Sequence, residues 1–203
     1  MKYIEHSHFY GKEIIDSDIS LQNTYKEVLD TLDNISDTDL VKVYQNNDLG
    51  SGLSRTLNKV LKNNLDKMNW QKDISIFDDK FADVNRKKWK LDYFSETNIS
   101  LLISTQHSYA VTYNLMRTLL SGSSNRIFKN INTKLGILIT ITNETKVWGG
   151  FDSSIGTYED YIEQCKILTS HTNMPIIIIG IEPYDTFYLK KENKIEGNIK
   201  FIH

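Results

Sequence analysis

The side chains best suited to chemistry lie together in one stretch of the chain. Asp92 precedes a short turn, and Ser104, Thr105 and Gln106 directly follow the apolar run Ile99 to Ile103. Carboxylate, hydroxyl and amide oxygens are the ligand types that hard cations such as Mg2+ bind. A carboxylate on one strand and polar groups at the end of the next therefore suggest a metal cradle. Spacing alone leaves a second interpretation open, a hairpin with a solvated tip.

Two strands and a turn would hold these side chains in place. Residues 89–94 alternate between apolar and polar side chains, which is typical of a half-buried strand. We expect Trp89, Leu91 and Tyr93 to share one face of it. Residues 95–98 are turn formers, and the apolar run that follows is continuous enough for a more central strand.

Helical and strand patterns alternate along the rest of the chain. Apolar residues recur at helical spacing in residues 20–34, 53–68, 111–120 and 157–168. Two further continuous apolar runs, 135–141 and 175–181, are typical of buried strands. This order predicts an α/β fold with a helix-flanked mixed β-sheet. A length of 203 residues, 39% of them hydrophobic, is enough for one core, so we expect a single domain over residues 1–203.

Charge is nearly balanced over the whole chain and uneven along it. The formal net charge of -2 disfavours a general nucleic-acid coating protein, which is usually strongly basic. A site-specific DNA enzyme needs only a local basic surface. Four basic residues cluster just before Asp92, namely Arg86, Lys87, Lys88 and Lys90. The alternative for this cluster is a solvated strand edge, which lysines commonly protect.

The single cysteine and the lack of long apolar stretches bear on the compartment. Cys165 has no partner for an intramolecular disulfide, which favours a reducing environment. The longest apolar stretch, residues 174–181, is far too short to span a membrane, so we expect a cytoplasmic protein with no membrane partner. Cys165 and His171 would be poorly placed as a hydrolase pair, because such partners usually come from separate elements.

The stretch around Asp92 resembles the BglII/BstYI branch of type II restriction endonucleases. These belong to the PD-(D/E)XK nuclease superfamily and are more distantly related to BamHI. In that branch an Asp ends one strand, and the next strand carries Glu-X-Gln, Glu-X-Glu or Glu-X-Lys before a polar-aromatic turn into a helix. Asp92 matches the Asp, Gln106 matches the last motif position, and Ser108-Tyr109 with Asn114 and Arg117 is similar to the helix entry. Further similar segments cover residues 4–13, 57–70, 153–164 and 175–183.

One departure from the family pattern concerns catalysis. Ser104 stands where the family has its metal-binding Glu. A hydroxyl lacks the negative charge of a carboxylate and is a poor ligand for Mg2+. Some related nucleases recruit the carboxylate from the following helix, but residues 108–121 contain no Asp or Glu. Glu96 in the turn and Asp66 on the preceding helix are the remaining candidates.

The resemblance implies a homodimeric, Mg2+-dependent endonuclease that hydrolyses double-stranded DNA at a short palindrome. The branch acts at sites centred on GATC, which makes a GATC-containing site one expectation. Asp92 would hold the metal, Gln106 would position water or phosphate, and Ser104 would be a substituted ligand. The alternative is a catalytically impaired or dead protein on the same fold, which binds DNA as a dimer without cutting it. A generic structural protein is the third possibility.

The resemblance also implies where DNA would bind. Base contacts are expected from residues 107–109 and 153–159. The candidate DNA-binding residues are Lys88, Lys90, His107, Ser108, Tyr109, Asn114, Arg117, Ser153, Ser154, Thr157, Tyr158 and Glu159. Phosphate contacts are expected from Lys87, Lys88, Lys90, Arg117 and Arg126. The alternatives are structural, with Thr157 as a helix N-cap, Tyr158 as a surface aromatic and the basic residues as a solvated face.

Overall fold

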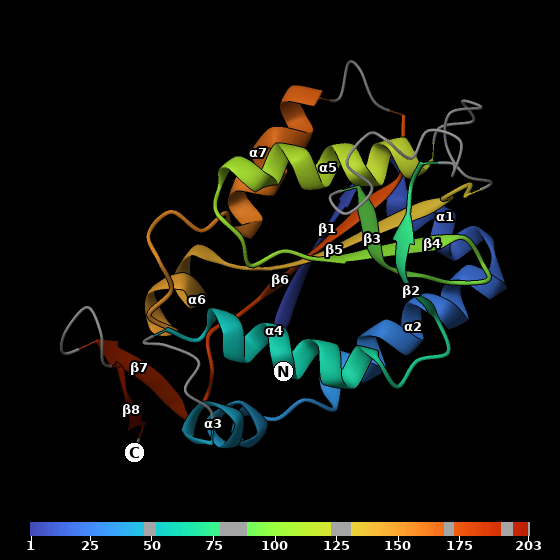
Figure 1. The fold of residues 1–203 in the computed structure, drawn as a ribbon. Helices are drawn as coiled ribbons and strands as arrows, with labels where there is room; N and C mark the ends of the chain where they lie inside the picture. The colour runs from blue at the N-terminus through green and yellow to red at the C-terminus, as the bar shows by residue number, and fades with distance from the viewer. Residues whose placement is uncertain (47–51, 78–88, 123–130, 169–172, 192–196, 203) are drawn as a thin grey trace.

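A six-stranded mixed sheet forms the centre of the molecule in a computed structural model (Figure 1). The structure describes residues 1–46, 52–77, 89–122, 131–168, 173–191 and 197–202. In spatial order the strands are β1 (Tyr3–His8), β6 (Ile176–Ile181), β5 (Leu135–Ile141), β4 (Ile99–Ile103), β3 (Lys90–Phe94) and β2 (Gln71–Ser75). Strands β4, β5 and β6 are parallel, whereas β1, β3 and β2 each pair antiparallel with a neighbour. The predicted mixed sheet and the central place of β4 are confirmed.

Helices cover both faces of this sheet (Figure 1). On one face lie α2 (Ile19–Asp33), α3 (Asp37–Gln45) and α4 (Ser54–Leu65), and on the other lie α5 (Tyr109–Ser121) and α7 (Tyr158–Leu168). Two short helices, α1 (Gly11–Ser17) and α6 (Asn143–Trp148), follow β1 and β5. Among the helices in the described parts of the chain, none has both the length and the apolar character needed to cross a bilayer.

The core is divided by the sheet into two apolar clusters. Ile137 and Ile139 of β5 pack toward α2 and α4, whereas Leu138 packs toward α5 and α7. Covered on both faces, the central parallel strands are apolar without alternation, which explains their continuous pattern. Strand β3 behaves differently, because Leu91 joins the cluster under α5 and Tyr93 joins the opposite one. The expectation that these two side chains share a face was wrong.

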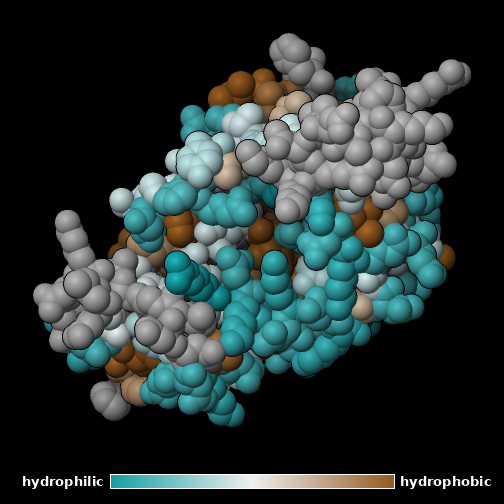
Figure 2. All heavy atoms as spheres, in the orientation of Figure 1, coloured by the Kyte–Doolittle hydropathy of each residue, from teal (hydrophilic) through white to brown (hydrophobic). Residues whose placement is uncertain are grey.

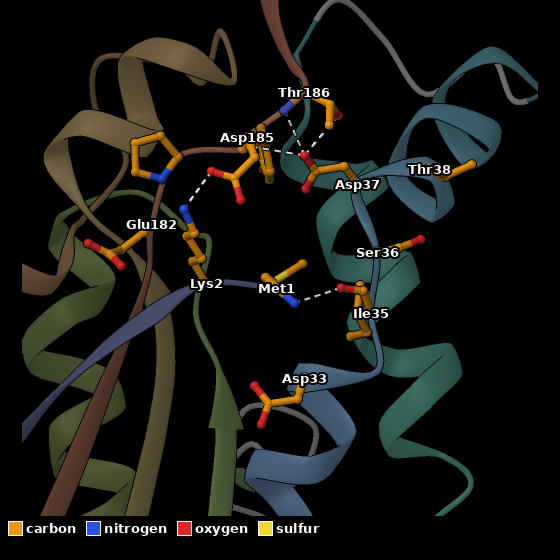
Figure 3. Close-up of a pocket in the computed structure, with 12 residues that line it drawn as sticks. Met1, Lys2, Asp33, Ile35, Ser36, Asp37, Thr38, Glu182, Asp185 and Thr186 are labelled. Carbon is orange, nitrogen blue, oxygen red and sulfur yellow. Dashed lines mark hydrogen bonds and ion pairs between the residues drawn. The ribbon is translucent and has the colours of Figure 1, made fainter. Parts of the chain in front are cut away.

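A separate two-stranded hairpin completes the chain. Its strands β7 (Phe187–Lys191) and β8 (Gly197–Phe201) pair antiparallel. The Asp37 carboxylate at the start of α3 accepts hydrogen bonds from the backbone amides of Asp185 and Thr186, each at 2.9 Å. These residues line a pocket of about 450 Å3. In it Lys2 also pairs with Asp185 at 2.6 Å (Figure 3). These hydrogen bonds and this ion pair anchor the segment that leads into the hairpin.

Candidate functional site

The polar residues that follow β4 lie at the edge of the sheet where its parallel strands end. Strands β4, β5 and β6 run in the same direction, so their carboxyl ends face one side of the molecule. Strand β3 is antiparallel to β4, which places Asp92 near that same edge. In open α/β sheets this edge commonly carries the binding groups.

Asp92 marks the point where β3 and β4 separate. The two strands pair at Tyr93 with Leu101 and at Phe94 with Ser100. Beyond these pairs, the backbone N–H of Ile103 donates to Oδ2 of Asp92 at 2.8 Å. The carboxylate therefore replaces a strand partner and lies between the two strands.

The electrostatic surroundings of Asp92 are mixed. Burial raises the pKa of Asp92 above its ordinary value, and the nearby negative charge of Asp73 adds to this effect. The hydrogen bond from Ile103 and the positive charges of Arg117 and Lys62 act in the opposite direction. Asp73 lies on β2 between two residues that pair with β3, which brings it opposite Asp92. Sequence analysis did not single out Asp73, and the available signal was an acidic residue in a short strand beside the motif.

The two carboxylates considered as replacements for the missing family Glu lie elsewhere. Asp66, at the end of α4, accepts a hydrogen bond from the Tyr93 hydroxyl at 3.0 Å and pairs with Lys72 at 3.1 Å. Glu96 is exposed in the turn at the opposite end of β3 from the strand separation. Within the described ranges, no three His, Cys, Asp or Glu side chains gather as a possible metal-binding group.

Ser104 is turned toward the helical layer of α5 and α7. Its Oγ accepts hydrogen bonds from Nδ2 of Asn114 at 2.6 Å and from the hydroxyl of Tyr161 at 2.5 Å. The Asn114 amide also donates to the Tyr161 hydroxyl at 2.8 Å. All three side chains are buried. With two donors directed at it, the Ser104 hydroxyl acts as a structural acceptor in the protein interior, and in the described part of the chain Asp92 shares no hydrogen bond with Ser104 or Gln106.

Arg117 extends this buried network to β3. Its guanidinium donates to the backbone oxygen of Lys90 at 2.7 Å and to Oδ1 of Asn114 at 2.5 Å. The same group lies over the ring of Tyr113, 5.2 Å from its centroid. Asn114 and Arg117 were predicted to contact DNA, yet both side chains are buried and bonded within the protein.

Thr105 bonds to the opposite helical layer. Its Oγ1 accepts a hydrogen bond from Nδ2 of Asn58 at 2.6 Å, and its backbone oxygen accepts one from Ser54 Oγ at 3.2 Å. Ser104 and Thr105 are adjacent in the chain but bond to helices on opposite faces of the sheet. The strand end thus holds α4 and α5 at fixed positions on either side of the separation at Asp92.

A row of basic side chains lies along α4 and was missed in the sequence. Arg55, Lys59 and Lys62 are exposed, and their spacing places them on one face of the helix. Helix α4 contains no acidic residue. In Figure 2 the surface around α4 is hydrophilic, and it borders a hollow that separates α4 from α5. The sequence signal that could have revealed this row was three basic residues at positions i, i+4 and i+7 with no acidic residue between them.

The structure brings the two predicted base-contacting segments together. The N–H of Ser108 donates to the oxygen of Ser154 at 2.6 Å, and the N–H of Gly156 donates to the oxygen of Gln106 at 3.0 Å. A Cβ on Gly156 would approach Val111 to 2.4 Å, so only glycine allows this contact. We call residues 106–109 together with 152–156 the paired loops. The side chains of residues 106–109 and 152–154 are exposed.

His107 is held within the paired loops by a chain of polar contacts. Its Nδ1 forms a short hydrogen bond with Oγ of Ser154. Ser154 in turn donates to Oδ1 of Asp152 through its backbone N–H at 2.8 Å and through its hydroxyl at 2.6 Å. The ring of Tyr109 stacks on the imidazole with centroids 5.6 Å apart, and Tyr109 is 81% exposed. These contacts fix the orientation of an exposed imidazole.

The remaining predicted residues divide between structure and surface. Thr157 is buried, and its N–H and hydroxyl donate to Asp160 at 2.9 and 3.2 Å. Tyr158 is also buried and packs over Gly180, so it is no surface aromatic. Glu159 is exposed and accepts a hydrogen bond from the N–H of Asn143 at 2.9 Å, Lys90 is half-buried, and Ser153 is exposed. Lys87, Lys88, Arg126 and His171 lie outside the described residues.

Comparison with known proteins decides the family. A family model described as restriction endonuclease BglII/BglIII matches residues 3–181. This chain belongs to the BglII/BglIII family of restriction endonucleases. The resemblance inferred from residues near Asp92 is thereby confirmed, and enzymes of this family generally depend on a divalent metal. No curated protein matches the chain.

Solved structures show the same fold as this family member. A crystal structure of restriction endonuclease BglII complexed with a DNA 16-mer is 19% identical, covers 100% of both chains and superposes with a TM-score of 0.69. A crystal structure of free BglII is 18% identical, covers 99% of this chain and 94% of its own, and gives a TM-score of 0.56. At these identities the likeness concerns the fold, and it confirms a restriction-endonuclease-like sheet.

Proposed function

We propose that this protein is a site-specific double-stranded DNA endonuclease that hydrolyses phosphodiester bonds at a short palindrome with Mg2+. The observation that carries the proposal is the position of Asp92, whose carboxylate lies where β3 and β4 separate. The match to a restriction endonuclease family over residues 3–181 supports a nuclease role for this position. A GATC-containing palindrome is the first sequence to test. The whole chain would act as one domain in the cytoplasm, the compartment that its single free cysteine favours.

The carboxylates at and opposite Asp92 are ligands of the kind that Mg2+ binds. Mg2+ is commonly held by one or two carboxylates together with waters and substrate phosphates. Only Oδ2 of Asp92 is engaged by Ile103 in the described structure, which leaves Oδ1 as a ligand atom. Asp73, opposite it on β2, is a second carboxylate within electrostatic range. Bound there, Mg2+ would polarise the scissile phosphate and lower the pKa of a bound water.

The chain itself would supply orientation and charge. Exposed Gln106, at the end of β4, would position water or phosphate through its amide. The basic row on α4, Arg55, Lys59 and Lys62, would contact phosphates and set the register of the duplex. The paired loops would contact bases, because their exposed polar side chains are the groups that distinguish base edges. A homodimer with two-fold symmetry would present two such surfaces to the two halves of a palindrome.

A second candidate is a protein on the same fold that binds DNA as a dimer without cutting it. One observation favours it: the hydroxyl of Ser104, at the family Glu position, is bonded to Asn114 and Tyr161 inside the protein. It is therefore directed away from the role of a metal ligand. This candidate keeps the basic row on α4 and the paired loops in use, and it gives Asp92 no catalytic part.

Plasmid digestion separates the two candidates. Wild type is incubated with supercoiled DNA in Mg2+ or Mn2+ beside Asp92→Asn, with Asp16→Asn, at an exposed position on α1, as the matched control. We expect wild type and the control to cut, and Asp92→Asn to lose roughly a thousandfold or more in rate, since a metal site supplies several kcal/mol of transition-state stabilisation. Cutting by Asp92→Asn at the wild-type rate would contradict the proposal.

A binding measurement completes this test. If wild type shifts a palindromic duplex but leaves it intact in both metals, the second candidate is supported. Ser104→Glu then asks whether a carboxylate at this position restores cutting. Because Ser104 is buried among hydrogen-bond donors, circular dichroism must first show that this variant folds.

A further inference from the structure

The tautomer of a neutral His107 is set by the two residues behind it. The imidazole Nδ1 and the hydroxyl of Ser154 share a hydrogen bond, and that hydroxyl lies 2.6 Å from Oδ1 of Asp152. An ionised carboxylate only accepts hydrogen bonds, so the single hydroxyl proton of Ser154 must be directed to Asp152. The proton between Ser154 and His107 therefore belongs to the imidazole Nδ1.

This tautomer determines what His107 offers to a ligand. With the proton on Nδ1, a neutral imidazole has a lone pair on Nε2 and is an acceptor there. His107 is exposed, and the ring of Tyr109 stacks on it at an interplanar angle of 16°. Two constraints thus act on the ring, a polar chain at one nitrogen and an aromatic face against its plane. Such preorganisation lowers the entropy cost of forming one directed hydrogen bond.

Resting on the DNA-binding function proposed above, we infer that His107 is a specificity-determining residue that accepts a hydrogen bond from an exocyclic amino group of a base. In the major groove this donor is N6 of adenine or N4 of cytosine. Guanine O6 and N7 and thymine O4 are acceptors, and a second acceptor facing them is unfavourable. Asp152 acts through Ser154 as a positioning residue. Sequence analysis named His107 and Ser154 as DNA-binding residues and left out Asp152.

Selection from a duplex pool tests the base preference. The full chain is mixed, in EDTA, with duplexes randomised at their centre, and the bound sequences identify an adenine or cytosine that each half-site requires. That base is then replaced by purine for adenine or by 2-pyrimidinone for cytosine, analogues that lack only the amino group. We expect wild type to bind the analogue roughly tenfold more weakly, as one good base contact requires. His107→Ala should bind both duplexes equally.

Nitrogen NMR of the imidazole tests the positioning role without DNA. Wild type should show the proton on Nδ1 of His107. In Asp152→Asn the side-chain amide can donate to Ser154, which frees the hydroxyl proton for His107, so the Nε2–H form should increase. The same variant should lose most of the amino-group preference, whereas Asp16→Asn should keep both the tautomer and the preference.

The outcomes separate this inference from the function on which it rests. If wild type selects no duplex, the proposed DNA-binding function fails, and the base preference of His107 fails with it. If wild type selects duplexes and His107→Ala keeps the amino-group preference, the inference alone is overturned. An Nε2–H tautomer in wild type would overturn the role of Asp152.

Discussion

The buried network at the end of β4 and the paired loops lie beside each other and use polar side chains in opposite ways. In the network, Ser104 after β4 and Asn114 and Arg117 on α5 are buried and bond to one another or to backbone oxygens. In the paired loops, His107 and Tyr109 are exposed, and the imidazole is held by Ser154 at Nδ1 and by the Tyr109 ring at its face. The first arrangement uses hydrogen bonds to maintain the position of α5. The second leaves donors and acceptors for a ligand.

The sequence predicted DNA contacts from both regions. In the structure, the residues of the buried network stabilise the fold, and the exposed residues of the paired loops are the ones that can contact a ligand. Buried polar groups stabilise a structure only while all of them are bonded, and losing one partner is costly. Exposed groups contribute little to the free energy of folding, so their removal should change ligand binding and leave stability nearly the same. The following predictions test whether the two regions are as distinct as their contacts indicate.

The largest effect is expected at the centre of the buried network. Asn114→Ala removes the acceptor of Arg117 and the donor to Ser104 and Tyr161, which leaves a buried cation with one fewer partner. We expect the free energy of unfolding to fall by about 3 kcal/mol. Urea denaturation measures this, with exposed Asn63→Ala on α4 as the matched control. A loss as small as that of the control would mean that the network does not stabilise the fold.

A smaller effect is expected from the two hydroxyls of the same network. Ser104→Ala and Tyr161→Phe should each lower the free energy of unfolding by about 1–2 kcal/mol, because each leaves a buried partner with one hydrogen bond fewer. Since the two groups bond to each other, the double variant should lose less than the sum, by about 1 kcal/mol. Strict additivity in the double-mutant cycle would contradict the assignment of Ser104 as a structural acceptor.

Removal of one basic residue from α4 should weaken DNA binding several-fold and leave stability unchanged. Lys62→Gln removes one proposed phosphate contact, so the slope of log affinity against log salt should become shallower by about 1. Fluorescence anisotropy across a salt series measures the slope. Lys12→Gln, exposed on α1, should leave it as in wild type. An unchanged slope in Lys62→Gln would remove α4 from the proposed DNA surface.

The smallest effect is the pH dependence of stability that comes from buried Asp92 beside the end of β4. Burial raises the pKa of Asp92, so the folded state holds this proton more tightly than the unfolded state. Folding therefore loses stability as the pH rises from the ordinary Asp value to the raised one, and the penalty persists above it. Asp92→Asn should raise the melting temperature at neutral pH, with a gain that shrinks under acidic conditions. A variant that is less stable than wild type at neutral pH would contradict this.

Much of the fold follows from local patterns. Strands β4 and β5 have the bounds that their apolar runs predict, and α2 agrees within one residue at each end. Helices α1 and α6 were missed because, at 7 and 6 residues, they are too short to show apolar periodicity. The prediction that Leu91 and Tyr93 share a face of β3 was wrong. The strand separates from β4 at Asp92, between these two residues, and each packs into a different apolar cluster.

The sequence by itself determined which chemical groups follow one another along the chain: the Asp92 carboxylate, a turn, a buried strand and the polar residues after it. It also determined the family that this segment resembles. Only the tertiary structure decided which polar groups face outward. Ser104 and Thr105 are neighbours that bond to opposite helical layers. Ser154, which lies 47 residues after His107 in the chain, joins His107 to Asp152. The physical reason is that hydrogen-bond partners are set by how helices pack on the sheet, and no local pattern records that packing.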